Sequence, residues 1–290
     1  GGAVGLSLGN ARQPTPAAAD CACPDWIVFN SNRDGNWELY VAGADGSNPA
    51  RLTADDGIDM APTVNQCATN DATWVAFQSN RMGKWQIYRV NIWGESLQQL
   101  TEAGNNMHPV WSKICGSLRI AFVSDRDGNP EIYYMNGDGT GERRVTNHRA
   151  ADRSPDWAPA GSALVFQSER DGNWEIYRVD MSGLNLKRLT NHSASDVDPK
   201  WSPDGRSIAF ASNRDGSWQI YMMPAGGGTA VRLTAGGNNQ RPVWSPDSRY
   251  VAYQSDRDGN WEVYVVDTVT RAESRVTNNP ARDQAPSWSC

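Results

Sequence analysis

Two sets of polar residues recur along this chain at a spacing that can arrange them in a ring. The first is the arginine of a repeated Arg-Asp-Gly turn, found at Arg33, Arg81, Arg126, Arg170, Arg214 and Arg257. The second is an Asp or Asn three residues before a proline, found at Asp59, Asn106, Asp152, Asp196, Asn239 and Asp283. A ring of carboxylates can hold a cation. Because both partners recur in every repeat, we favour Arg–Asp and Arg–Asn pairs that form a structural turn ring.

A few residues depart from the repeated pattern and are the alternative candidates for chemistry. Met82 replaces the aspartate of one turn, and Pro130 replaces a repeated tryptophan. His148 and His192 lie in equivalent loops, with His108 nearby, and three histidines on adjacent loops are compatible with a weak metal site. Solvated loop histidines are the simpler interpretation. No hydrolase, zinc-protease or phosphate-loop motif is present, and no single nucleophile–base set stands out. We therefore expect no catalytic residue, no metal and no cofactor.

The elements that carry these residues repeat six times. The turn arginines are 43 to 48 residues apart, which is a period typical of repeat architectures. In one unit, Pro199–Gly205 reads as a short strand and a turn, Ser207–Ser212 as a second strand, and Trp218–Met223 as a third. Asp-Gly turns join strands into hairpins. A fourth short strand follows at Val231–Thr234. Six units of four antiparallel strands predict an all-β, six-bladed β-propeller over residues 21–290.

The two ends of the chain predict how the ring closes. The first repeat begins at Trp26 without the preceding Pro-x-Trp-Ser strand, and the chain ends with that strand at Pro286–Cys290. We therefore expect the C-terminal strand to join the N-terminal blade. Aromatic residues that occur once in each blade are expected to pack between sheets rather than to bind a ligand.

Five cysteines lie near this predicted closure or in the corresponding turns of the next two blades. We predict a Cys23–Cys290 disulfide across the closure and a Cys67–Cys115 disulfide between neighbouring blades, and Cys21 is then a free or intermolecular thiol. The alternative is that all five are reduced and buried. Disulfides would imply an oxidising compartment.

The repeated motifs resemble those of the TolB-like, or WD-like, family of propeller repeats. Pro242-Val243-Trp244-Ser245-Pro246-Asp247 and Arg257-Asp258-Gly259 carry the family pattern, and the resemblance covers about residues 24–290. It implies a propeller fold. It also implies an extracytoplasmic binding scaffold, although fold predicts function only weakly.

Residues 1–20 form an N-terminal extension outside the repeats. Gly2, Ala3, Val4, Gly5, Leu6, Ser7 and Leu8 include a period-2 alternation typical of a strand, and a Pro/Ala-rich linker follows. Such a segment can add to an exposed sheet edge of a neighbouring molecule. A disordered leader is the alternative.

Composition excludes some classes of function. The net charge of -6 argues against nucleic-acid binding, and no apolar run is long enough to span a membrane. The main hypothesis is a non-enzymatic, extracytoplasmic (secreted, cell-surface or periplasmic) interaction protein that self-assembles into an oligomer or filament by donating residues 2–8. Its partners are other proteins, including copies of itself. One alternative is a monomeric periplasmic TolB-like scaffold that binds a partner protein on its loop face. The other is a propeller hydrolase or lyase with a site at the channel mouth.

Overall fold

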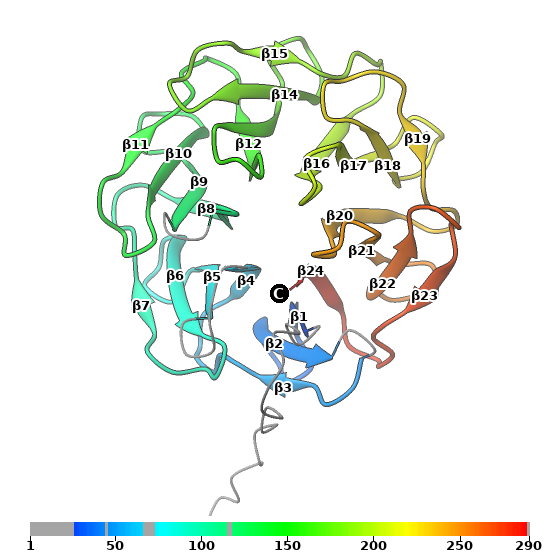
Figure 1. The fold of residues 1–290 in the computed structure, drawn as a ribbon. Helices are drawn as coiled ribbons and strands as arrows, with labels where there is room; N and C mark the ends of the chain where they lie inside the picture. The colour runs from blue at the N-terminus through cyan, green and yellow to red at the C-terminus, as the bar shows by residue number, and fades with distance from the viewer. Residues whose placement is uncertain (1–25, 44–45, 66–72, 115–117, 289–290) are drawn as a thin grey trace, which may run out of the picture.

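The computed structural model describes residues 26–43, 46–65, 73–114 and 118–288. In these residues the chain forms 24 strands and no helix. The strands make six four-stranded antiparallel sheets, which stand around a central axis like the blades of a propeller (Figure 1). The predicted six-bladed β-propeller is therefore confirmed. No helix in the described ranges has the length and hydrophobicity needed to cross a membrane.

Each blade runs from an innermost strand beside the axis to a short outermost strand at the rim. Blade 1 consists of β24 (Asp283–Trp288), β1 (Trp26–Ser31), β2 (Glu38–Gly43) and β3 (Ala50–Arg51). Blade 2 consists of β4 (Asp59–Val64), β5 (Trp74–Ser79), β6 (Gln86–Asn91) and β7 (Gln98–Gln99). Blade 3 consists of β8 (Asn106–Trp111), β9 (Arg119–Ser124), β10 (Glu131–Asn136) and β11 (Arg143–Arg144). Blade 4 consists of β12 (Asp152–Trp157), β13 (Ala163–Ser168), β14 (Glu175–Asp180) and β15 (Lys187–Arg188). Blade 5 consists of β16 (Asp196–Trp201), β17 (Ser207–Ser212), β18 (Gln219–Pro224) and β19 (Val231–Arg232). Blade 6 consists of β20 (Asn239–Trp244), β21 (Tyr250–Ser255), β22 (Glu262–Asp267) and β23 (Glu273–Arg275).

The ring closes within blade 1, as the sequence predicts. Strand β24 from the C-terminal end pairs antiparallel with β1, and Ile27 lies opposite Trp288. Blade 1 therefore takes three strands from the start of the described chain and one from its end (Figure 1).

The hydrophobic core is divided into six clusters, one between each pair of neighbouring blades. The cluster between blades 6 and 1, for example, contains Phe29 and Tyr40 from blade 1 with Val263 from blade 6. Within each blade the repeated Phe or Tyr of the second strand lies against the repeated Tyr of the third, at 5.9 to 6.0 Å between ring centroids. Fully burying one such ring contributes about 1.5–3 kcal/mol, so the repeated aromatics hold neighbouring blades together.

A backbone hydrogen bond also joins each blade to the next. The N–H of each ring Asp or Asn donates to the carbonyl that precedes the third strand of the previous blade; Asp59 N–H, for instance, donates to Trp37 O at 2.9 Å. In the third blade Pro130 supplies this carbonyl to Asp152, also at 2.9 Å. Proline lacks only the N–H. It can therefore replace tryptophan here without loss of the inter-blade bond.

All six innermost strands share a bulge at their third residue. The residues there have positive φ angles of 50–53°, and they are Ala61, His108, Ser154, Asp198, Arg241 and Ala285. Each stands directly before a proline, and the pairing register shifts at this point in every blade. A left-handed residue other than glycine costs about 1–2 kcal/mol. The surrounding sheet must therefore hold this conformation in place.

Candidate functional site

The predicted turn ring forms six Arg–Asp or Arg–Asn pairs, each within one blade. Arg214 is representative: its Nη2 donates to both carboxylate oxygens of Asp196 at 2.9 Å, and its Nε donates to Ser212 Oγ at 3.0 Å. Its guanidinium also lies 4.7 Å from the centroid of the Tyr221 ring. The other pairs are Arg33–Asp283, Arg81–Asp59, Arg126–Asn106, Arg170–Asp152 and Arg257–Asn239. All six arginines are thus engaged by their own blade.

Two blades supply the negative charge from a different position. Where the ring residue is Asn106, Arg126 also pairs with Glu142, and where it is Asn239, Arg257 pairs with Glu273. The positions equivalent to these glutamates in the four aspartate blades are Pro49, Leu97, Leu186 and Ala230. Every blade therefore provides a carboxylate to its turn arginine, either from the ring or from a glutamate at or immediately before the start of the outermost strand.

Among the described residues, one cluster of three carboxylates includes a member of the ring. Glu38, Asp55 and Asp59 approach one another at the boundary of blades 1 and 2. Arg81 bridges Asp55 and Asp59 at 2.7 Å each, and Arg51 Nη2 donates to Glu38 at 2.9 Å. Burial raises the pKa of Asp59 to about 6. The two arginines thus pair with all three carboxylates, and the same Arg–Asp and Arg–Glu pairs recur in other blades.

The loop histidines cap turns. His148 Nδ1 accepts the N–H of Ala150 at 3.1 Å, and His192 Nδ1 accepts the N–H of Ala194 at 3.0 Å. In the corresponding loop Asn279 Oδ1 accepts the N–H of Ala281 at 2.8 Å, so an amide can serve the same purpose. Among the described residues the three histidines do not gather into one metal-ligating group.

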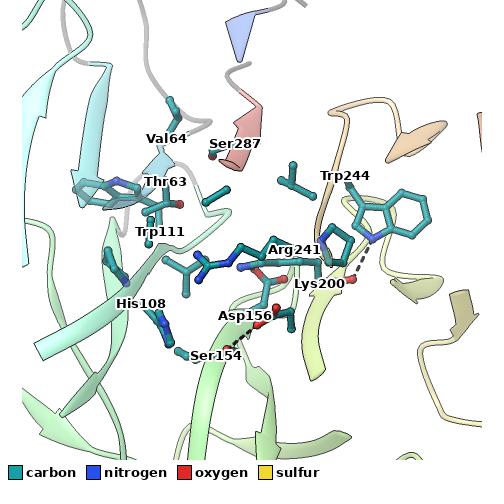
Figure 2. A pocket seen from close by; sticks show the side chains of 18 of the residues that line it. Thr63, Val64, His108, Trp111, Ser154, Asp156, Lys200, Arg241, Trp244 and Ser287 are labelled. Atoms are coloured by element: carbon teal, nitrogen blue, oxygen red, sulfur yellow. Dashed lines mark hydrogen bonds and ion pairs between the residues drawn. The ribbon is translucent and has the colours of Figure 1, made fainter. Parts of the chain in front are cut away.

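The polar residues that do not repeat converge in the central channel. The innermost strands line a cavity of about 130 Å³. His108, Ser154, Asp198 and Arg241 face it from the bulges of β8, β12, β16 and β20, and Ala61 and Ala285 hold the same position in blades 2 and 1. Figure 2 shows Arg241 and Lys200 extending into this space, with His108 on the wall opposite.

A second layer of the channel contains one aspartate held between two lysines. Asp156 lies between Lys113 and Lys200, with Oδ2 at 3.3 Å from Lys113 Nζ and Oδ1 at 3.5 Å from Lys200 Nζ. Its Oδ2 also accepts the N–H of Trp201 at 2.8 Å, and Lys113 Nζ donates to Trp201 O at 2.5 Å. Burial lowers the pKa of Lys113. This network fastens blades 3, 4 and 5 to one another.

Sequence reasoning found the turn ring and did not find the channel residues, apart from His108. In the sequence, the channel residues at the bulges can be located as the residue immediately before the proline of each Pro-x-Trp motif. That position is fixed in the repeat, but its identity changes from blade to blade.

Several predicted residues lie outside the described ranges. They are the assembly segment Gly2–Leu8, the domain boundary at residues 20 and 21, and all five cysteines: Cys21, Cys23, Cys67, Cys115 and Cys290. The predicted pairings of these cysteines therefore stay predictions.

Comparison with known proteins identifies the family. The family described as "TolB beta propeller domain" matches residues 102–190 and, in a second overlapping match, 154–242. Together with the six blades, this decides the assignment. The chain is a TolB-like β-propeller.

Curated relatives and solved structures agree with this assignment. A protein named "Protein TolB homolog" from Chlorobium luteolum is 30% identical over 138 residues, which are 48% of this chain and 30% of that protein. A "Tol-Pal system protein TolB" from Desulfosudis oleivorans is 31% identical over 120 residues, 41% of this chain and 26% of that protein. The chain thus matches less than a third of the length of these relatives. The crystal structure of TolB from Acinetobacter baumannii superposes with a TM-score of 0.77 at 23% identity, covering 91% of this chain and 66% of that one.

The structural likeness shows the fold. Other solved chains that share it include a lyase and a hydrolase, each at 16% identity or less, so both binding proteins and enzymes use this architecture.

Proposed function

We propose that this TolB-like propeller is a non-enzymatic scaffold that acts outside the cytoplasm and binds a partner protein on the face that carries the turn ring. Family membership is the observation that carries the proposal, since one of the matched relatives bears the name of a component of the Tol-Pal system. The chemistry of the repeats supports it. The turn arginines and their carboxylates bond to each other within blades and so serve architecture.

The hydroxyl of Ser154 also supports a non-enzymatic function. It donates to Asp198 Oδ1 at 2.9 Å. In a serine-hydrolase relay the serine hydroxyl instead bonds to the imidazole that takes its proton. The Ser154 hydroxyl is therefore not bonded to His108, the histidine that lines the same cavity among the described residues.

Blade 2 provides the most distinctive surface on the proposed binding face. In the other five blades the turn aspartate accepts a hydrogen bond from the repeated tyrosine, as Asp215 does from Tyr221. Blade 2 has Met82 at that position, 75% exposed, and Tyr88 donates to Gln99 Oε1 at 2.9 Å instead. Methionine is flexible and polarisable and is frequent at binding surfaces. We place the partner contact at this turn.

Site-specific photo-cross-linking tests the proposal. A photoreactive phenylalanine analogue is placed at Met82, and in a matched variant at Arg206, whose exposed side chain lies in the turn after β16 on the opposite face. Illumination of the source cells is expected to join one discrete envelope protein to position 82 and none to position 206. Equal labelling at both positions, or no adduct at position 82, would refute the proposed face.

Self-assembly through residues 2–8, which the sequence suggested, is a separate proposal, and the comparisons give it no support. Deletion of residues 1–12 tests it separately, with molar mass measured by light scattering. A molar mass that the deletion does not change would favour the monomeric scaffold. A fall from the mass of an oligomer to that of a monomer would support self-assembly through this segment.

A further inference from the structure

The fold does not require any particular side chain at the bulge position in the channel. Alanine occupies it in blades 2 and 1, at Ala61 and Ala285, with φ angles of 52° and 50°. The four other blades have His108, Ser154, Asp198 and Arg241 with φ angles of 50–53°. Because alanine satisfies the same backbone, the polar side chains at this position require a reason other than folding.

Arg241 and Asp198 face the same cavity from neighbouring strands, β20 and β16, yet they form no ion pair, although both belong to the described part of the chain. Asp198 Oδ1 accepts the hydroxyl of Ser154, and Oδ2 accepts no hydrogen bond from any residue in the described ranges. The Arg241 guanidinium, half-buried in the channel, has no protein acceptor among the described residues. A charge removed from bulk water without a partner is costly. Space between an unpaired cation and an unpaired anion suits a ligand that carries both charges.

A further polar atom beside this space lacks a partner. Within the described ranges His108 Nδ1 is buried without a hydrogen-bond partner, and His108 lines the cavity. Burial and the positive charge of Arg241 lower the pKa of His108 to about 4. The imidazole is therefore neutral at pH 7 and can accept or donate one hydrogen bond.

The size of the cavity limits the ligand. At about 30 Å³ for each water in the liquid, a volume of about 130 Å³ corresponds to roughly four water molecules. That is room for a small metabolite but not for a folded segment. A guanidinium matches a carboxylate with two parallel hydrogen bonds, whereas a carboxylate such as Asp198 attracts an ammonium group.

We propose that the channel binds a free α-amino acid, with its carboxylate on Arg241 and its ammonium group on Asp198. Asp156 is already neutralised by Lys113 and Lys200, so Asp198 is the carboxylate left to receive the ammonium. This inference is independent of the partner-binding function proposed above, because it concerns the interior of the ring rather than the turn at Met82.

Saturation-transfer NMR with unlabelled probes tests the site in the full chain. Glycine, glycolate and acetate share a carboxylate and differ in whether an ammonium, a hydroxyl or a hydrogen occupies the other end; L-serine is added as a larger amino acid. We expect glycine and L-serine to bind, glycolate to bind more weakly and acetate most weakly. Hydrogen bonds to charged groups contribute about 1.5–3 kcal/mol, so removing one corresponds to a loss of about tenfold or more in affinity.

Alanine variants assign the two ends. Arg241→Ala should weaken all the probes by tenfold or more, whereas Asp198→Ala should weaken glycine by tenfold and leave acetate unchanged or tighter. Arg206→Ala, which removes an exposed arginine with an 87% exposed side chain, controls for net charge and should change nothing. Ala61 and Ala285 indicate that both alanine variants fold, and melting curves verify it. No transfer to either amino acid, acetate binding equal to glycine, or an Arg241→Ala variant that binds normally would overturn the proposal.

Discussion

In blades 3 and 6 the ring residue is asparagine, and a glutamate near the outermost strand supplies the carboxylate instead. The same replacement can be made by mutation in blade 5. Asp196 is fully buried and supplies the carboxylate for Arg214. Ala230 stands where blades 3 and 6 have Glu142 and Glu273. Asp196→Asn therefore creates an asparagine blade without its glutamate, and Asp196→Asn with Ala230→Glu recreates the arrangement of blades 3 and 6.

The expected cost follows from the burial of this pair. Removing one partner of a buried ion pair costs about 3–5 kcal/mol, because the other charge is left uncompensated. The Arg214 side chain is 19% exposed, so water solvates part of it, and asparagine still accepts one hydrogen bond, as Asn106 does from Arg126 at 3.0 Å. We expect Asp196→Asn to lower the free energy of unfolding by about 2 kcal/mol, and the added glutamate to restore about half of that loss or more.

Guanidinium unfolding followed by tryptophan fluorescence measures these differences, provided that the slope with denaturant is equal among the variants. Asp196→Asn with Val231→Glu is the matched control. It adds the same charge one residue further along, and successive side chains of a strand point to opposite faces. A double variant with Ala230→Glu that is no more stable than this control would refute charge exchange, and so would an Asp196→Asn variant as stable as the wild type.

Three further outcomes follow from the structure and the sequence. Because the pKa of His108 is about 4 in the folded chain and about 6.5 unfolded, its contribution to stability is complete above pH 6.5 and is lost as the pH falls to 4. His108→Ala should therefore lose up to about 3 kcal/mol less unfolding free energy than the wild type between pH 7 and 4, and an equal loss in the two proteins would contradict this. If Cys23 and Cys290 are joined, Cys290→Ser should lower the unfolding free energy by about 5 kcal/mol in oxidising buffer and change nothing under reductant, and a wild type insensitive to reductant would contradict the pairing. Met82→Asp, which restores the repeated turn residue, should raise the melting temperature and weaken binding of the partner identified by cross-linking at position 82, measured by pull-down; unaltered capture of the partner would contradict the proposed contact.

The repeats explain why so much of the fold was predictable. The strand Ser207–Ser212 has the bounds expected from its sequence, and the strand expected at Trp218–Met223 is Gln219–Pro224. Six copies of one signal reinforce each other. A turn or an aromatic position that is ambiguous in one copy is clear in the set, and the closure through Trp288 follows from the one strand missing at the start.

The channel was not predictable for two physical reasons. A residue before proline is normally extended, so nothing in the sequence indicates the left-handed bulge that aims Arg241 inward. The amino-acid types at this position also differ between blades, and a search for repeated residues ignores them. Glu142 and Glu273 were missed for a related reason. Their pairing with the turn arginines can be inferred only by noting that the same two blades have Asn106 and Asn239 in place of the ring aspartate.

The shared first blade also has a consequence for how the protein is made. A ribosome that has produced β3 must add the residues up to Asp283 before the innermost strand of that blade begins to emerge. At about 5–20 residues per second, this delay is roughly 10 to 50 s. During that time the inner edge of β1 has unpaired backbone groups, and the cluster around Phe29 lacks its partners from blade 6 and from Trp288. The nascent chain is thus most open to mispairing with another nascent chain at β1, and the synthesis of β24 ends that exposure.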